Sequence, residues 1–141
     1  MLSTIRSYEP DDFDAVDRLW KECFPGAPVR NHAEHAIPAK LWAGDDLFIV
    51  AQGEGGGIIG TVMAGYDGHR GWIYAVAVDS RCRRQGIGAA LVRAAEERLI
   101  ALGCMKINLQ IHSDNAAVAR FYYRIGYALE QRISMGKQIH R

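Results

Sequence analysis

A single segment restricts the possible folds of this chain more than any other: a basic loop with two glycines that joins an apolar run to an amphipathic one. The apolar run, residues 72–78, is typical of a buried strand, and the periodicity of residues 87–102 predicts a helix. A strand, a short loop and a helix in this order are the first half of a strand–helix–strand crossover, whose strands must be parallel. The segment therefore predicts a sheet that contains a parallel pair of strands.

The composition of the loop predicts an anion site at the start of the helix. Gly86 and Gly88 lack Cβ atoms, so backbone N–H groups can approach a ligand closely. The first four N–H groups of a helix have no partner inside the helix, and the helix dipole is positive at this end. Arg81, Arg83 and Arg84 add positive charge. We expect a phosphate or pyrophosphate ligand, although a basic turn that caps the helix would give the same pattern.

Two common phosphate-binding loops do not fit this segment. The dinucleotide fingerprint needs a third glycine three residues after the second, where this chain has Leu91. A P-loop needs Gly-Lys-Ser/Thr at its end, and no such tripeptide follows. The spacing is instead Arg83-x-x-Gly86-x-Gly88 after a Val-x-Val strand, which disfavours a flavin or nucleotide module of either kind.

Length and composition predict one globular domain that spans residues 1–141. A net charge of +1 disfavours a general nucleic-acid binder, whose domain would be markedly basic. Three widely spaced cysteines, without a Cys-x-x-Cys pair or a zinc-like Cys/His spacing, predict neither a disulfide framework nor a metal site. The sequence has no secretion signal and no run of 18 apolar residues, so we expect a cytoplasmic protein without a membrane partner.

The hydrophobic pattern predicts helices and strands along the whole chain. Asp67-Gly68 is a tight-turn dipeptide, so the strands on either side of it are expected to form a hairpin. The order predicts a mixed α/β (α+β) fold in which an antiparallel N-terminal meander precedes a parallel pair. The expected ranges are strands over 3–8, 47–51, 58–66, 71–78 and 105–111, a final strand or hairpin over 127–139, and helices over 10–24, 31–43 (disturbed by Pro38), 86–102 and 115–125.

A second group of polar residues follows the strand that is expected to pair in parallel with residues 71–78. Ligands bind beyond the carboxyl ends of parallel strands, so residues 82–88 and 113–115 are expected to face the same cleft. Asn115 and Tyr122 are seven residues apart, nearly two helical turns, and therefore point the same way. Taken alone, Tyr122 is better explained as a core residue whose hydroxyl bonds to a backbone carbonyl.

Both segments resemble the GNAT superfamily of N-acetyltransferases. Residues 83–88 are similar to its coenzyme A loop, Arg/Gln-x-x-Gly-x-Gly/Ala, and residues 115–127 to its element Asn-x-x-Ala-x-x-Leu/Phe-Tyr-x-x-x-Gly-Phe/Tyr. Residues 60–71 are similar to the hairpin of the small YpeA-type acetyltransferases, and residues 76–89 to the RimI type, which acetylates ribosomal-protein alanines. The resemblance implies a GNAT fold whose parallel strand pair splays around an acetyl-CoA cleft.

The same resemblance implies roles for individual residues. Successive loop amides would bind the pyrophosphate of acetyl-CoA, Asn115 would contact its pantetheine arm, and a backbone N–H of the preceding strand would stabilise the thioester oxyanion. The Tyr122 hydroxyl would face the sulfur and act as the catalytic general acid, or at least as a hydrogen-bond donor to the sulfur. The expected coenzyme-binding residues are Val76, Ala77, Val78, Arg83, Arg84, Gln85, Gly86, Ile87, Gly88, Ala89 and Asn115.

No general base stands at the position that the resemblance predicts. RimI-type enzymes carry a Glu five residues before the Asn, but this chain has Gln110 there, and an amide cannot accept a proton at neutral pH. We expect a primary amine of a small molecule or peptide as the acceptor. The residues considered for the acceptor side are Trp20, Glu22, Phe24, Arg30, His32 and Trp42, with Tyr74 on the central strand.

Two functions are compatible with this pattern. The first is an acetyl-CoA-dependent N-acetyltransferase that works by direct attack in a ternary complex, and the loop and Tyr122 together favour it. The second is a non-catalytic acyl-CoA sensor or interaction domain that retains the fold, which the missing base keeps open. The sequence also leaves open whether two copies form a homodimer.

Overall fold

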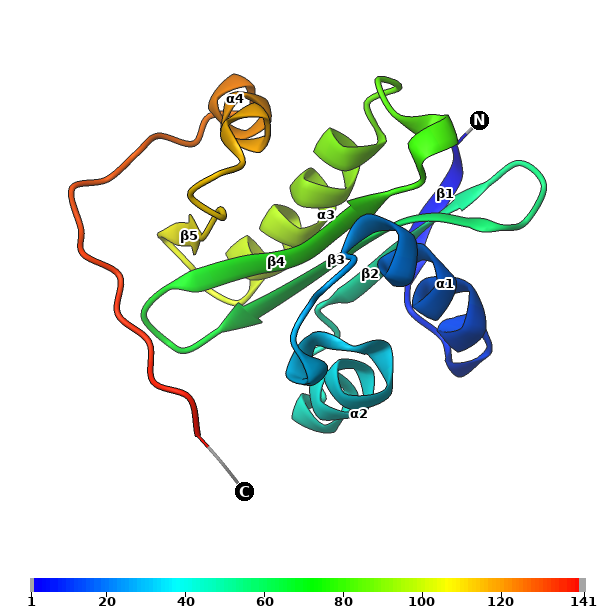
Figure 1. Cartoon of the computed structure of the whole chain (residues 1–141), viewed down its shortest axis with the longest axis horizontal. Coiled ribbons are helices and arrows are strands. Elements are labelled where there is room, and N and C mark those ends of the chain that lie inside the picture. Colours follow the sequence, from blue (N-terminus) through cyan, green and yellow to red (C-terminus); the bar gives the residue numbers. More distant parts are fainter. Residues whose placement is uncertain (1, 140–141) are drawn as a thin grey trace. The chain divides into compact units, whose positions relative to one another are not determined.

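A five-stranded mixed sheet forms the centre of the first of two compact units in the computed structural model (Figure 1). The structure describes residues 2–139, apart from the side chain of Ser3. The first unit ends at Gln110 and the second begins at Ile111. The strands are β1 (Leu2–Ser7), β2 (Phe48–Gly53), β3 (Ile58–Tyr66), β4 (Gly71–Val78) and β5 (Ile107–Leu109). The helices are α1 (Phe13–Cys23), α2 (Ala33–Ala43), α3 (Ile87–Ala101) and α4 (Ala116–Arg124), with 3-10 turns at Pro10–Asp12, Val29–Asn31 and Ser80–Cys82.

The strands lie in the order β1-β2-β3-β4-β5. The first four strands pair antiparallel, and β5 pairs parallel with β4 after the α3 crossover. The Asp67-Gly68 turn closes the β3–β4 hairpin, and the Asp67 carboxylate accepts hydrogen bonds from the backbone N–H groups of His69 and Arg70, both at 2.7 Å. The mixed sheet, the hairpin and the parallel pair that the sequence predicts are therefore confirmed.

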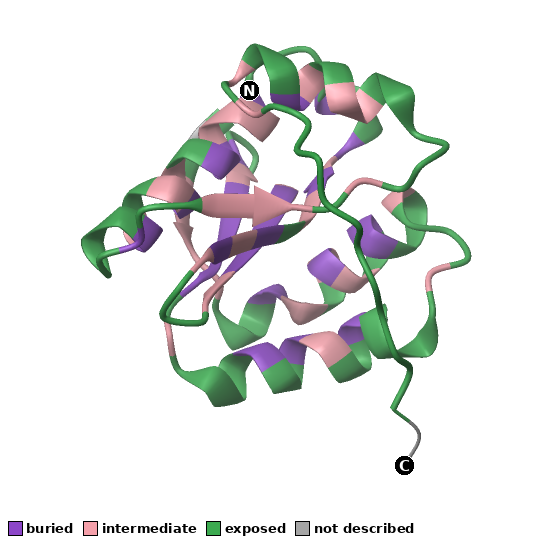
Figure 2. Ribbon diagram, turned by 90° about the vertical axis from the view of Figure 1, so that its left-hand side faces the viewer, coloured by how far each residue is buried: buried purple, intermediate pink, exposed green. Residues whose placement is uncertain are grey.

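Helices cover both faces of this sheet. On one face α1 and α2 enclose a core that includes Val16, Trp20, Ile37 and Phe48, all buried. On the other face α3 packs on β2, β3 and β4. Figure 2 shows the buried residues gathered in the strands and on the sides of the helices that face them. The sheet is thus the middle layer of a three-layer unit.

Two glycines let α3 approach the sheet closely. A Cβ atom on Gly60 would lie 2.8 Å from Leu91 Cδ1, and one on Gly71 would lie 2.9 Å from Leu99 Cδ1. Both leucines are fully buried, so their side chains fill the space that any larger residue would need. This close packing fixes the position at which α3 begins relative to the end of β4.

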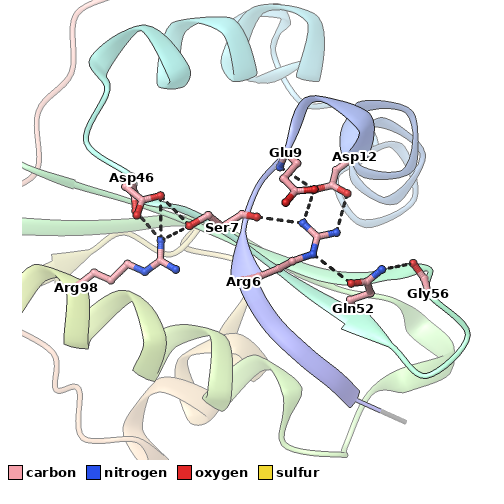
Figure 3. Close-up of polar contacts among 8 residues, drawn as sticks. All are labelled: Arg6, Ser7, Glu9, Asp12, Asp46, Gln52, Gly56 and Arg98. Atoms are coloured by element: carbon pink, nitrogen blue, oxygen red, sulfur yellow. Dashed lines mark hydrogen bonds and ion pairs between the residues drawn. The ribbon is translucent and has the colours of Figure 1, made fainter.

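Two arginines attach β1 to its neighbours (Figure 3). Arg6 makes a bidentate ion pair with Asp12, at 2.8 and 3.0 Å, and this hydrogen-bonded guanidinium lowers the pKa of the Asp12 carboxyl. Arg98 of α3 donates to Ser7 Oγ at 2.9 Å and to the Asp46 carbonyl at 2.8 Å. Both guanidinium groups therefore stabilise the fold, and their charges are compensated.

Three elements differ from the sequence prediction. β5 has three residues instead of seven, because only Ile107–Leu109 pair with β4. α2 continues through Pro38, which lies in the middle of the helix on an exposed side and whose missing N–H costs one helical hydrogen bond. The structure has no strand over 127–139, although its apolar residues alternate, because the side chains of Leu129, Ile133 and Met135 are exposed and bury no face of a sheet.

Candidate functional site

The basic loop leaves β4 and ends at the first turn of α3, as predicted. Gly86 is the N-cap residue of α3 and has a φ of +79°, a conformation that side chains with a Cβ rarely adopt. A Cβ atom on Gly86 would meet no atom within 4 Å, so its backbone faces open space. The first helical hydrogen bond runs from Ala90 N–H to the Gly86 carbonyl. The preceding N–H groups, those of Ile87, Gly88 and Ala89, have no partner inside the helix and can bind an anion.

The charges of the three loop arginines are not equivalent. Arg81 donates to both carboxylate oxygens of Asp79, at 3.1 and 2.9 Å, and this pairing lowers the pKa of Asp79. The Arg83 Nε donates to the Val78 carbonyl at 3.3 Å. Arg84 is exposed and has no hydrogen-bond or ion-pair partner among residues 2–139. Arg81 therefore maintains the shape of the loop, whereas Arg83 and Arg84 make no ion pair with the described residues and their charges are available to a ligand.

The last five residues of β4 extend beyond its parallel partner. The register between β4 and β5 ends at Ile73 and Leu109, whereas β4 continues to Val78. The two parallel strands therefore stop pairing after the third residue of β4. Beyond that residue, one edge of β4 is left without a paired strand. An extended ligand that reaches the loop can lie along this edge and bind the backbone groups of the strand.

β4 contains a β-bulge at the point where the two parallel strands stop pairing. Thr61 faces Ala77 and Met63 faces Tyr74, so two residues of β4, Ala75 and Val76, stand opposite Val62 alone. Ala75 has a φ of +53°, although it is not a glycine. The sequence prediction missed this bulge, since nothing in the apolar run of residues 72–78 distinguishes it from a regular strand.

The acceptor-side residues proposed from the sequence do not form one group. Trp20 is 5% exposed and belongs to the core, so it cannot line a pocket, because its indole packs against Phe48 and the sheet. Trp42 is 91% exposed. Glu22 accepts a hydrogen bond from Ser80 Oγ at 2.8 Å, which links α1 to the start of the loop. A buried residue that the sequence did not single out, Lys40, pairs with Asp45 at 2.8 Å.

The second unit carries Asn115 and Tyr122 on one short helix, α4. Asn115 is its exposed N-cap residue, and its side chain makes no capping hydrogen bond. Tyr122 is the buried residue of α4, and its ring packs edge-to-face on Phe121 and Tyr127. Burial raises the pKa of Tyr122 to about 12. The hydroxyl therefore keeps its proton at neutral pH and can donate it in a hydrogen bond.

The Tyr122 hydroxyl is not used inside the protein. It has no hydrogen-bond partner among residues 2–139, which disagrees with the alternative that a backbone carbonyl satisfies it. In the same part of the chain, every fully buried side-chain oxygen or nitrogen has a partner. The hydroxyl must therefore reach the surface while the ring is buried, an arrangement that suits a proton donor to a ligand.

The described residues add three further findings. Between residues 2 and 139, no three side chains of the metal-binding types lie together in a way that could hold an ion. Cys23, Cys82 and Cys104 are free thiols. Within the same range, no helix combines the length and the apolar character that crossing a membrane requires.

Sequence comparisons agree with the architecture. The family model described as Acetyltransferase (GNAT) family matches residues 13–127. An acetyltransferase of Pectobacterium atrosepticum is 43% identical over 135 residues, which cover 96% of this chain and 94% of the relative. An acetyltransferase of Yersinia pestis is 40% identical over 135 residues, with the same coverage of 96% and 94%. The similarity thus extends over almost the full length of both chains.

Solved structures show the same fold. Ard1 from Thermoplasma volcanium has a TM-score of 0.78 and 25% identity, covering 90% of this chain and 83% of its own. Glucosamine-6-phosphate N-acetyltransferase from Arabidopsis thaliana has a TM-score of 0.70 and 25% identity, covering 97% and 98%.

Proposed function

Because this chain belongs to the GNAT family of acetyltransferases, we propose that it moves the acetyl group of acetyl-CoA to a primary amine of a small molecule or peptide. One observation carries the proposal: a glycine loop with available N–H groups lies at the start of α3, directly after a strand whose end has separated from its parallel partner. The name of the Arabidopsis relative gives an amino sugar as acceptor, which supports a small primary amine here.

In this proposal the loop binds the pyrophosphate of acetyl-CoA. The N–H groups of residues 84–89 donate to its oxygens, and the positive end of the α3 dipole stabilises its charge. The Arg84 guanidinium, which no described residue compensates, adds a second source of attraction. The pantetheine arm then follows β4 and contacts Asn115. Each of these contacts needs only backbone groups or residues that are exposed.

The reaction is a direct attack of the amine nitrogen on the thioester carbonyl carbon. A C–N bond forms, the C–S bond breaks, and the sulfur leaves with the electron pair. A backbone N–H in the segment 76–78 stabilises the negative charge that develops on the carbonyl oxygen. The Tyr122 hydroxyl donates a proton to the departing sulfur, and the amine loses its proton to water.

The acceptor is expected to lose its proton without an enzyme carboxylate, because Gln110 stands where RimI-type enzymes carry a Glu. Activity should therefore rise with pH across the pKa of the acceptor itself. The measurement is kcat/KM against pH for two acceptors whose amine pKa values differ by about two units. The midpoints should differ in the same way as the two amines. A midpoint near neutral pH that is the same for both acceptors would show that a residue of the enzyme supplies the base.

The activity itself is tested with purified protein, acetyl-CoA and a panel of amines: amino sugars, polyamines, amino acids and peptides with a free α-amine. Release of the free thiol must coincide with the addition of one acetyl group to the acceptor, measured by mass spectrometry. Coenzyme A binding by calorimetry, without acetylation of any acceptor, would instead support a non-catalytic acyl-CoA sensor.

A further inference from the structure

A chain of two hydrogen bonds, the first buried and the second partly buried, connects α1 to the bulge in β4. Trp20 Nε1 donates to Thr61 Oγ1 at 2.9 Å, and Thr61 Oγ1 donates to the Ala75 carbonyl, also at 2.9 Å. Thr61 is completely buried and Trp20 almost completely. The indole N–H is the only polar group of the Trp20 side chain. Through Thr61 it is connected to Ala75, the one residue of β4 that has a positive φ.

The direction of this chain is fixed by the chemistry of its members. An indole N–H can only donate, so the Thr61 oxygen must accept from Trp20. The single proton of the Thr61 hydroxyl is then committed to the Ala75 carbonyl. Turning this proton toward the indole would oppose the Trp20 N–H, and turning it elsewhere would leave the Ala75 carbonyl without the donor that Thr61 provides.

The Ala75 carbonyl sets the direction of the next N–H. The peptide group is planar and trans, so the Val76 N–H points opposite to the Ala75 carbonyl. That carbonyl points to Thr61 of β3, and the Val76 N–H therefore points away from β3, toward the edge of β4 that β5 has left. A carbonyl that accepts a hydrogen bond also makes the N–H of the same peptide a stronger donor.

From this geometry we propose that Trp20 and Thr61 are positioning residues, which hold and polarise the Val76 N–H as the donor to the thioester oxygen. The inference rests on the proposed acetyl transfer, and it selects one amide from the segment 76–78. A residue with a Cβ does not keep a positive φ without support, and the Thr61 hydroxyl supplies that support from the core. The two side chains act through the peptide and touch neither substrate.

The main test is Thr61→Val, which removes the hydroxyl and nearly conserves the shape. We expect kcat to fall roughly 10- to 100-fold, which is less than the loss expected when one oxyanion donor is removed completely. The KM for acetyl-CoA and the affinity for coenzyme A should stay within about twofold, because the loop that binds the pyrophosphate is unchanged. Thr61→Ser keeps the hydroxyl and should recover most of the lost kcat.

Two further measurements separate positioning from simple destabilisation. Trp20→Phe keeps the bond from Thr61 to Ala75 but frees the hydroxyl to rotate, so kcat should fall less than in Thr61→Val. Amide hydrogen exchange at Val76, followed by NMR together with the melting temperature, should be slower in Thr61→Val than in Thr61→Ser at matched stability, because the Ala75 carbonyl then polarises the Val76 N–H less. A folded Thr61→Val protein with the kcat of Thr61→Ser, or with unchanged exchange at Val76, would overturn the proposal. Wild-type protein that acetylates no amine would overturn the proposed function, and the exchange measurement would still test the hydrogen-bond chain.

Discussion

Replacing Gly86 by valine is expected to weaken coenzyme A binding by roughly 10- to 100-fold, the equivalent of one lost hydrogen bond to a charged group. The Cβ atom would project into the open space beside the N–H groups of residues 87–89, where the pyrophosphate is proposed to lie. A β-branched residue also resists the φ of +79° that turns the chain into α3. Isothermal titration calorimetry with coenzyme A and with inorganic pyrophosphate measures the effect directly.

Gly103 provides the matched control. It also has a positive φ, +94°, and a Cβ atom there would likewise meet nothing within 4 Å, but it follows the C-terminal end of α3. Gly103→Val should therefore carry a similar backbone strain and leave coenzyme A affinity unchanged. If Gly86→Val is folded and binds coenzyme A as tightly as Gly103→Val, the pyrophosphate does not lie on this loop.

The glycine loop could be predicted from the sequence because its conformation depends on local features. A glycine at the start of a helix, after a run of apolar residues, is enough to place a cap and a set of available N–H groups. The sequence analysis overestimated the number of loop arginines whose charge is available to a ligand. Arg81 is committed to Asp79, and that pairing depends on the 3-10 turn at Ser80–Cys82, which the pattern of residue types does not encode.

The bulge in β4 could not be predicted, because its cause lies elsewhere in the chain. Ala75 and Val76 look like any other residues of an apolar strand. The irregularity arises from the register with β3 and from the hydrogen bond that Thr61 donates to the Ala75 carbonyl. The position of Trp20 likewise depends on residues far away in the chain. An aromatic residue at helical spacing fits an acceptor pocket or a core equally well until its partners are known, and Trp20 was therefore considered for the pocket.

Residues 105–111 and 127–139 show the limit of alternation as a signal. Both segments alternate between apolar and polar residues, yet only Ile107–Leu109 form a strand. The alternating pattern indicates which face of a strand would be buried, but pairing with a neighbouring strand decides whether the strand forms.

The expectation that residues 82–88 and 113–115 face one cleft depends on the position of the second unit. It stays a prediction that the next experiment tests.

Tyr122→Phe is expected to lower turnover roughly ten- to a thousandfold, the scale of one general-acid contribution, because phenylalanine cannot protonate the departing sulfur. The effect should be partial, since a thiol with a pKa near ~8.5 leaves fairly well without help. Coenzyme A affinity should change little, because the substitution removes one hydroxyl that has no partner among residues 2–139. Since burial raises the pKa of Tyr122 to about 12, the hydroxyl stays protonated, and the ratio of wild-type to variant rates should not change between about pH 6 and pH 9.

The neighbouring residue Tyr123 separates the role of the hydroxyl from that of the ring. Tyr123 is 47% exposed and lies on the same helix, so Tyr123→Phe removes a hydroxyl from α4 without touching the buried ring. This variant should keep wild-type turnover and a similar melting temperature. Tyr122→Phe keeps the edge-to-face packing on Phe121 and Tyr127, so it should also melt as the wild type does. Equal turnover of the two variants on a confirmed acceptor would mean that Tyr122 only packs, and that another group protonates the sulfur.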